Sequence, residues 1–389
     1  MPVPSPAALR PARTRAHRRP MRSLVATATA LLVAAALSPV LAGSPAGAVT
    51  RESDERRFFA GVPYTGEFAS PQVLVDGGRY YAVATNEDGN NLPAMSSDDL
   101  RTWIPRAPLP DYSLYRNWAG FNDALPRPAS WAATRWKDGA RRYGVWAPAI
   151  ARMGGRYVAA YAAVVSWKRM RLCISLAHAD HPEGTYADAS TKPIVCSSDP
   201  RGSIDPDLIS VGGKHYLIWK NAGVKGSSPT TTWIRQLNGK ATKFAKGSKA
   251  HLLLKTAESW EGNVTEAPDM IRYGGRFYLF YSGNAYTTRA YATGYAICAR
   301  VTGPCTRPTT RPLLSTNKVV VGPGGAAPFR DLEGRLRLAY HAWSGADPEE
   351  QDAVRRLAAE LGAEVALAAG IGELELHRGD PSYLLWRYF

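Results

Sequence analysis

One pattern of polar and apolar positions repeats five times along the chain. Each repeat has a small or acidic residue, a proline, a short apolar run, a glycine-containing turn and a second run rich in Tyr, Val and Leu. The five copies lie at residues 68–86, 145–163, 203–221, 265–283 and 324–343. A glycine turn between two runs of alternating apolar residues is typical of a β-hairpin. The sequence therefore predicts five similar hairpins.

The spacing of the repeats predicts how these hairpins are assembled. Their prolines fall at positions 71, 148, 206, 268 and 328, which gives intervals of 77, 58, 62 and 60 residues. A unit of this size that opens with a hairpin is typical of one four-stranded propeller blade. We therefore predict an all-β fold, a five-bladed β-propeller whose four-stranded antiparallel blades surround a central channel. The alternative is another β fold in which these prolines only begin strands.

In a propeller, the residues before the five prolines meet at one mouth of the channel. They are Ala69-Ser70, Trp146-Ala147, Ile204-Asp205, Glu266-Ala267 and Ala326-Ala327. Asp205 and Glu266 therefore bring two carboxyl groups to one cleft, and two carboxyl groups are the minimum for acid–base cleavage of a glycosidic bond. Aromatic residues on which a sugar ring can stack are expected nearby, at Trp103, Trp146, Trp260 and Tyr286.

Several short motifs, taken together, resemble those of glycoside hydrolase family 43. They are Trp146-Ala147-Pro148, Ser203-Ile204-Asp205-Pro206, Trp219-Lys220-Asn221, Trp260-Glu261-Gly262, Thr265-Glu266-Ala267-Pro268 and Tyr340-His341-Ala342-Trp343. Each motif is weak alone, but the set is specific and extends from about residue 60 to about residue 343. The resemblance implies an enzyme that hydrolyses O-glycosyl bonds of arabinose- or xylose-containing polysaccharides with inversion.

The resemblance also implies a role for each acid of the site. Glu266 corresponds to the general acid, and Asp205 to the aspartate that orients this acid and keeps it protonated through its negative charge. The family's general base is an aspartate before the proline of the first blade, where this chain has Ser70.

A serine hydroxyl does not act as a base near neutral pH without a partner that takes its proton. Because general-base assistance is worth about 10²–10⁴-fold, we expect either a hydrolase slowed by Ser70 or a non-catalytic carbohydrate-binding propeller. Glu67 and Asp88 are minor candidates for a replacement base.

The resemblance places further residues at the substrate, namely Trp146, Asn221, Trp260, Glu261 and His341. Glu261 either binds a sugar hydroxyl or shapes the turn at Gly262. His341 either faces the channel, where some family members hold calcium, or is a packed core histidine. The residues themselves form no metal-ligand pattern and no cofactor is required, although the resemblance allows a structural calcium ion in the channel.

The ends of the chain have a different composition from its middle. Residues 1–48 contain six arginines before residue 23, an apolar run from Leu24 to Ala42 and a small-residue site at residues 46–48, which is typical of an export signal. An uncleaved anchor is the alternative. We predict a signal peptide at 1–48, a propeller at 49–345 and an extension at 346–389. The extension is expected to contain a helix at 348–361, and one of two later segments, at 373–376 or 383–389, is expected to close the ring.

Charge and cysteines bear on the location and the partners. The formal net charge is +15, and +9 remains without residues 1–48, but Lys and Arg are dispersed rather than clustered. We therefore expect no nucleic-acid or membrane surface in the mature part. Four cysteines in an exported chain favour two disulfides, pairing Cys173 with Cys196 and Cys298 with Cys305. The sequence thus predicts a secreted, extracellular monomer that acts on a plant-type polysaccharide or oligosaccharide.

Overall fold

The computed structural model describes most of the repeat region. The described residues are 68–85, 90–101, 103–106, 123–137, 140–223, 228–317 and 320–343, together with the backbone of strands at 368–376 and 384–387. The chain divides into the units Met1–Ala48 and Val49–Phe389, and all described residues belong to the second. The predicted signal, Glu67, Asp88 and the helix at 348–361 lie outside them. No helix in the described part is long and apolar enough to span a membrane.

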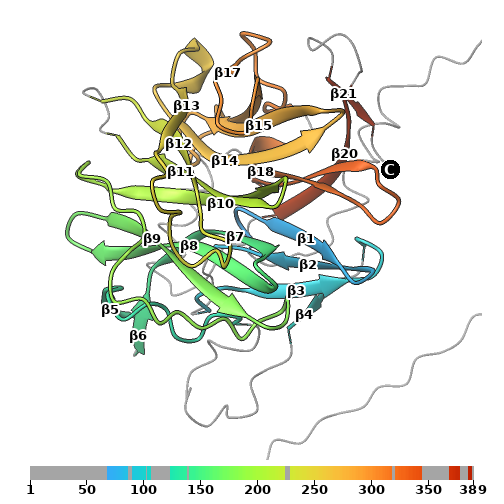
Figure 1. Cartoon of the computed structure of the whole chain (residues 1–389). Coiled ribbons are helices and arrows are strands. Elements are labelled where there is room, and N and C mark those ends of the chain that lie inside the picture. The colour runs from blue at the N-terminus through green and yellow to red at the C-terminus, as the bar shows by residue number, and fades with distance from the viewer. Residues whose placement is uncertain are drawn as a thin grey trace, which may run out of the picture. The chain divides into compact units, whose positions relative to one another are not determined.

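Four of the five repeats form four-stranded antiparallel sheets with strands in chain order (Figure 1). The first contains β1 (Gln72–Asp76), β2 (Arg79–Val83), β3 (Ala94–Ser97) and β4 (Ile104–Pro105). The third contains β10 (Ser203–Val211), β11 (Lys214–Asn221), β12 (Thr231–Gln236) and β13 (His251–Lys255). The fourth contains β14 (Thr265–Tyr273), β15 (Arg276–Gly283), β16 (Ala292–Cys298) and β17 (Cys305–Thr306). The fifth contains β18 (Val321–Arg330), β19 (Leu336–Trp343), β20 (Ala368–Leu376) and β21 (Leu384–Arg387).

The second repeat departs from the predicted four strands. Its sheet contains three, β7 (Val145–Met153), β8 (Arg156–Ser166) and β9 (Arg171–Ala179). The chain after β9 contacts that strand only through isolated bridges, among them one between Ile174 and Val195. A disulfide between Cys173 and Cys196, with Cα atoms 4.6 Å apart, ties the segment to β9 at this point. The covalent link thus holds the segment where the other sheets have a fourth strand.

A separate two-stranded hairpin precedes the second sheet. It consists of β5 (Thr134–Lys137) and β6 (Ala140–Tyr143). This hairpin lies within the longest interval between the repeats, the 77 residues from Pro71 to Pro148. The long interval therefore holds an additional element.

The predicted glycine turns are present in the first four repeats. The paired glycines at 77–78, 154–155, 212–213 and 274–275 all have φ between +55° and +84°. Both central residues of a type I′ turn need positive φ, which glycine adopts without steric cost. These turns set the strand register, in which Asp76 pairs with Arg79 and Val211 with Lys214.

The sheets close into a ring. The first strand of each repeat contacts the first strand of the next, and β18 returns to contact β1. Five apolar clusters fill the five interfaces between neighbouring sheets. Tyr161 belongs to the cluster between the first and second sheets, and Phe329 to the cluster between the fifth and first. Sheets packed face to face in a closed ring form a β-propeller.

The C-terminal segment completes the last sheet. β20 pairs with β19, and β21 pairs with β20, both antiparallel. Both segments that the sequence offered for ring closure therefore form strands of one sheet. The second predicted disulfide is also confirmed, since Cys298 and Cys305 are bonded, with Cα atoms 3.9 Å apart, across β16 and β17.

A residue in the left-handed conformation lies at or near the beginning of each first strand. These residues are Ser70, Ala147, Asp205, Ala267 and Gly325, with φ between +46° and +59°. In the first four repeats the next residue is the proline of the repeat, but in the fifth it is Ala326. The alignment of Ala326-Ala327-Pro328 was therefore wrong by two residues. The register supports this correction, because Gly324 pairs with His341 just as Glu266 pairs with Ser282.

Two positions after this residue, side chains line the channel axis or pack beside it. Asp207 and Asp269 are buried here, and Gln72 donates a hydrogen bond to the Asp269 carboxylate. Burial raises the pKa of Asp207 to about 7 against the effect of two backbone N–H donors. Burial, reinforced by the charge of Asp207, raises the pKa of Asp269 well above its ordinary value.

These raised pKa values predict a pH dependence of stability. A carboxyl whose pKa rises on folding contributes stability that is fully present below its unfolded pKa of about 4 and is lost as pH rises through the folded value, which is about 7 for Asp207. Asp269→Asn removes one of the two interacting charges. The melting temperature of Asp269→Asn minus that of wild type should therefore increase by a few degrees as pH is raised from about 5 to about 8. Asp98→Asn, at a side chain 73% exposed, is the control, and an equal shift in both variants would contradict the account.

Candidate active site

A cavity of about 430 Å³ opens over the left-handed residues at one mouth of the channel. Ser70, Asp205 and Glu266, the three residues predicted to carry the chemistry, all line it. Its walls also include the aromatic residues Trp146, Tyr286, Tyr291 and Trp343. A mostly apolar cavity with a few polar groups is the usual form of a small-ligand site. A much smaller void of about 30 Å³ lies against the prolines and Asp269, so a sugar fits only in the larger one.

Asp205 and Glu266 interact through a buried lysine. Lys220 Nζ lies 2.7 Å from Glu266 Oε2 and 4.0 Å from Asp205 Oδ2. Asp205 Oδ2 also accepts the backbone N–H of Ala267 at 2.8 Å, which joins the third sheet to the fourth beside the acid. Burial, with the charge of Glu266, raises the pKa of Asp205 to about 6 although Lys220 opposes this. For Lys220 the balance is reversed, because Glu266 and Asp205 raise its pKa despite its burial.

Ser70 is held from the neighbouring fifth sheet. Its backbone N–H donates to Nδ1 of His341 at 3.0 Å. Burial lowers the pKa of His341 to about 4, with Glu266 opposing the shift, so the ring is neutral at physiological pH. Tyr291 stacks on this ring with centroids 5.8 Å apart. His341 is thus both a cavity-lining residue, as expected, and a packed, hydrogen-bonded one.

Tyr291 connects the histidine to the acid. Its side chain is buried and interacts with Glu266 and with the hydroxyl of Ser282. Burial, followed by the charge of Glu266, raises the pKa of this phenol well above its ordinary value, so it stays protonated and able to donate. Ser282 in turn accepts the backbone N–H of Gly325 at 2.9 Å. Glu266 is therefore held on one side by Lys220 and on the other by Tyr291.

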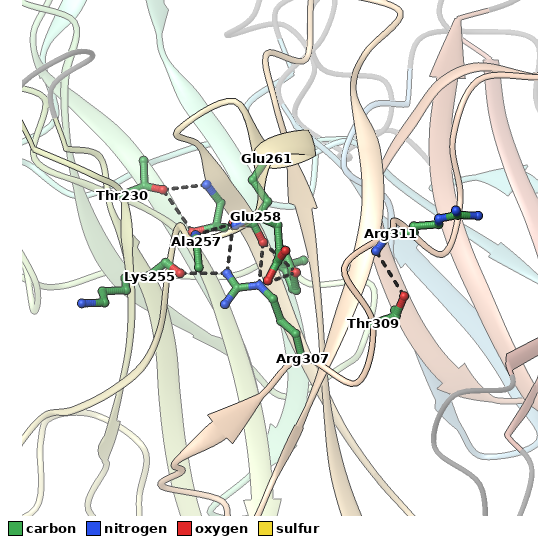
Figure 2. Close-up of polar contacts among 10 residues, drawn as sticks. Thr230, Lys255, Ala257, Glu258, Glu261, Arg307, Thr309 and Arg311 are labelled. Carbon is green, nitrogen blue, oxygen red and sulfur yellow. Dashed lines mark hydrogen bonds and ion pairs between the residues drawn. The ribbon is translucent and has the colours of Figure 1, made fainter.

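Glu261 does not reach the cavity. Its side chain is fully buried, and Oε1 accepts hydrogen bonds from Tyr281 at 2.8 Å and Arg307 at 2.6 Å. Oε2 accepts the backbone N–H groups of Ala257 and Glu258. Figure 2 shows Arg307 between Glu261 and the carbonyl oxygen of Lys255. The alternative in which Glu261 shapes the turn is the one that this geometry supports, since every carboxylate oxygen is already used within the protein.

Three more residues expected near the sugar lie elsewhere. Trp260 stacks on Tyr281 with centroids 5.7 Å apart, and Asn221 accepts hydrogen bonds from Ser203 and Trp219. Neither lines the cavity, and Trp103 is buried in an apolar cluster. The substrate-binding role of Trp260 and Asn221 therefore stays a prediction, without support from the lining of this cavity. Trp146 does line the cavity, as expected.

The residues present do not form a calcium cage. Calcium takes six to eight oxygen ligands, whereas the described residues hold no group of three or more His, Cys, Asp or Glu side chains able to bind a metal ion. Nδ1 of His341 is already used by Ser70. The channel calcium allowed by the sequence therefore stays a prediction without a ligand set among the described residues.

The comparison with protein families decides how this site is classified. The model of glycosyl hydrolases family 43 matches residues 63–362. The chain belongs to glycosyl hydrolase family 43. This match includes all five repeats and the whole cavity, so the protein is a glycoside hydrolase by family, as the sequence motifs indicated.

Relatives and solved structures agree with this assignment. A probable arabinan endo-1,5-α-L-arabinosidase A of Aspergillus flavus is 26% identical over 290 residues, which are 70% of this chain and 80% of the relative. The structure of a thermostable family-43 glycoside hydrolase matches with a TM-score of 0.64 and 20% identity, over 83% of this chain and 93% of the other. An endo-1,4-β-xylanase of Bacteroides thetaiotaomicron matches with a TM-score of 0.61 and 22% identity, over 84% and 96%. These two structures share the propeller fold of the chain.

Sequence reasoning missed several cavity residues. Lys220 lies in the Trp219-Lys220-Asn221 motif, to which the sequence assigned no role. A lysine on a buried strand nevertheless indicates a nearby carboxylate, since lysine is almost never buried unless paired. Thr85, Arg201 and Tyr291 lie outside the strands, after β2, before β10 and before β16. No periodicity of the sequence identifies residues at such positions.

The buried position of Glu261 predicts a stability role for this family-43 member. Glu261→Gln leaves Arg307 without its ion pair and turns an amide towards N–H donors, which should lower the free energy of unfolding by about 3–5 kcal/mol. KM for substrate should not change. Glu333→Gln, which breaks a pair with Arg335 at a side chain 58% exposed, is the control and should cost at most about 1 kcal/mol. Denaturant unfolding measures the free energy of unfolding, and initial rates measure KM. A raised KM with unchanged stability would indicate instead that Glu261 binds the substrate.

Proposed function

We propose that this family-43 member cleaves O-glycosyl bonds of arabinose- or xylose-containing polysaccharides, with Glu266 as the general acid. The observation that carries the proposal is the joint placement of Glu266 and Asp205, linked by Lys220, in an aromatic-walled cavity. An acid that protonates the leaving oxygen and an apolar surface for the sugar ring are the two features that glycoside cleavage requires.

The proposed mechanism assigns a step to each group. Glu266 donates its proton to the oxygen of the leaving sugar while water attacks the anomeric carbon from the side of Ser70. Asp205 positions this part of the site by accepting the Ala267 N–H beside the acid. Tyr291 and Lys220 hold the Glu266 carboxylate and stabilise the charge that it acquires once its proton has left. Attack from the face opposite the leaving group gives inversion.

The names of the relatives support a pentose substrate. The Aspergillus flavus relative is described as a probable arabinan endo-1,5-α-L-arabinosidase, and the structural neighbours include an endo-arabinase and an endo-1,4-β-xylanase of Bacteroides thetaiotaomicron. The aromatic side chains of Trp146 and Trp343 in the cavity wall suit a five- or six-membered sugar ring.

Fold and location belong to the same proposal. The five repeats are five blades, the second of them three-stranded and secured by its disulfide. Two disulfides suit an oxidising compartment. We therefore keep residues 1–48 as a cleaved signal peptide and the mature protein as a secreted monomer that meets its polysaccharide outside the cell.

A non-catalytic carbohydrate-binding role is the second candidate. The observation that favours it is Ser70, because Asp205 and Glu266 are the carboxyl groups among the described cavity residues, and none stands at the expected place of the base. Such a protein would bind arabinan or xylan saturably without releasing sugar.

Activity on linear arabino-oligosaccharides and xylo-oligosaccharides, whose leaving oxygen needs a proton, separates the two candidates. We expect slow turnover by wild type, its loss in Glu266→Gln, and a gain of about 10²-fold or more in Ser70→Asp, because a base is restored. Aspartate fits this position, since Asp205 occupies the equivalent place with φ of 54° against 51° for Ser70. Thermal unfolding of each variant checks that the fold is intact.

Two results would contradict the proposal. Turnover that survives Glu266→Gln would remove this residue from the role of acid. Saturable glycan binding without turnover by wild type, combined with turnover by Ser70→Asp, would establish the binding role for the native chain.

A further inference from the structure

The cavity wall around Ser70 carries hydrogen-bond donors where a base would present an acceptor. His341 Nδ1 accepts the Ser70 N–H at 3.0 Å, and the backbone N–H of Thr85 donates to Ala69 O at 2.9 Å. These contacts bring the side chains of Ser70, Thr85 and His341 to one part of the cavity, which all three line. Among the described residues of that wall there is no carboxylate.

The hydrogen bond from Ser70 fixes which nitrogen of His341 is protonated. A neutral imidazole has one N–H, and its other nitrogen is an acceptor. Since Nδ1 accepts a backbone N–H, the proton is on Nε2. The residue is only 8% exposed, and in the described part of the chain its Nε2 has no hydrogen-bond partner. His341 lines the cavity, so this N–H is a donor available to an acceptor bound there.

Two hydroxyls add donors to the same wall. Thr85 Oγ1 accepts the backbone N–H of Ala147 at 3.0 Å, which leaves its own hydrogen free to donate. The hydroxyl of Ser70 forms no hydrogen bond with any described residue. Arg201 lines the same cavity as an exposed cation, and its charge acts on Lys220. Hydrogen-bond donors bind an oxyanion better than a neutral water.

We propose that inorganic phosphate occupies this wall and attacks the anomeric carbon, so that the protein cleaves its glycosidic bond by inverting phosphorolysis. The proposal rests on the proposed function, because it uses Glu266 as the acid and the same sugar site. It also explains how a cavity without a base carries out cleavage. Water must lose a proton to a base as it attacks, whereas hydrogen phosphate is already an anionic nucleophile.

The reaction balances without an additional base. A phosphate oxygen lone pair forms the new bond to the anomeric carbon, and the bond from that carbon to the leaving oxygen breaks with its electron pair. The leaving oxygen takes the proton of Glu266. The sugar phosphate formed from hydrogen phosphate dianion keeps one proton, with a pKa of about 6, and this proton returns to the Glu266 carboxylate. The products are a sugar 1-phosphate and a shortened glycan.

The test compares cleavage of linear arabino-oligosaccharides and xylo-oligosaccharides with and without inorganic phosphate. Mature wild-type protein is incubated with each in a phosphate-free buffer and in the same buffer with phosphate. Phosphorus NMR detects the sugar 1-phosphate, and reducing-end release measures total cleavage. We expect sugar 1-phosphate as the main product and total cleavage raised about tenfold or more by phosphate, a part of what base assistance is worth.

Two variants separate phosphorolysis from hydrolysis. Ser70→Asp puts a carboxylate where the phosphate binds, so sugar 1-phosphate should disappear while hydrolysis without phosphate increases. Glu266→Gln should lose both reactions. A general effect of phosphate on the fold would not change the product of Ser70→Asp from sugar 1-phosphate to free sugar. It would also not abolish both reactions in Glu266→Gln.

Three outcomes overturn the inference. Cleavage that depends on Glu266 but is unchanged by phosphate refutes it and leaves the proposed function standing. Faster hydrolysis without sugar 1-phosphate shows phosphate acting as a base, which also refutes it. No cleavage by wild type in either buffer, while Ser70→Asp cleaves, refutes both this inference and the proposed function of the native chain.

Discussion

A left-handed residue near the start of each first strand is the constraint on which this molecule depends. It lies where the five sheets meet, and in four repeats its backbone N–H points towards the neighbouring sheet. A side chain of the preceding sheet accepts that N–H in four of the repeats, through His341, Thr85, Asp205 and Ser282. The same hydrogen bonds that join the sheets therefore position the groups of the cavity. Fold and site are one network here.

This arrangement explains why equivalent positions carry different chemistry. The left-handed position holds Ser70, Ala147, Asp205, Ala267 or Gly325, and the position before it holds Glu266 in the fourth repeat. The backbone is kept the same around the ring while the side chain varies. Ser70 accordingly has the same backbone conformation as Asp205, and it gives this wall of the cavity a hydroxyl where an aspartate would give a carboxylate.

The parts of this structure that follow local rules could be predicted from the sequence. Paired glycines set the hairpin turns, and prolines marked four of the five first strands, so repeats, sheets and the places of Asp205, Glu266 and Ser70 were accessible. The fifth repeat was misaligned because Pro328 was assigned to the position after the left-handed residue, which Ala326 occupies. The second sheet has three strands instead of the predicted four, since the segment after β9 contacts that strand through isolated bridges and the disulfide between Cys173 and Cys196.

Predictions that depended on burial were less successful. Glu261 and Trp260 lie in a motif of the family, but only packing shows that Arg307 and Tyr281 use them within the protein. Lys220 became meaningful only when its distance to two carboxylates was known. Contacts between residues far apart in sequence carry no periodicity, and for this reason the support around Glu266 could not be foreseen.

The anomeric configuration of the first product tests the central claim most directly. Proton NMR during the early turnover of an arabino- or xylo-oligosaccharide distinguishes the two anomers before they interconvert. The account predicts inversion, whether the attacking group is water or phosphate, because Glu266 acts as an acid and no carboxylate nucleophile lines the described cavity on the opposite side. Retention would require a covalent intermediate on a carboxylate, and would contradict the proposed roles of Glu266, Asp205 and Ser70.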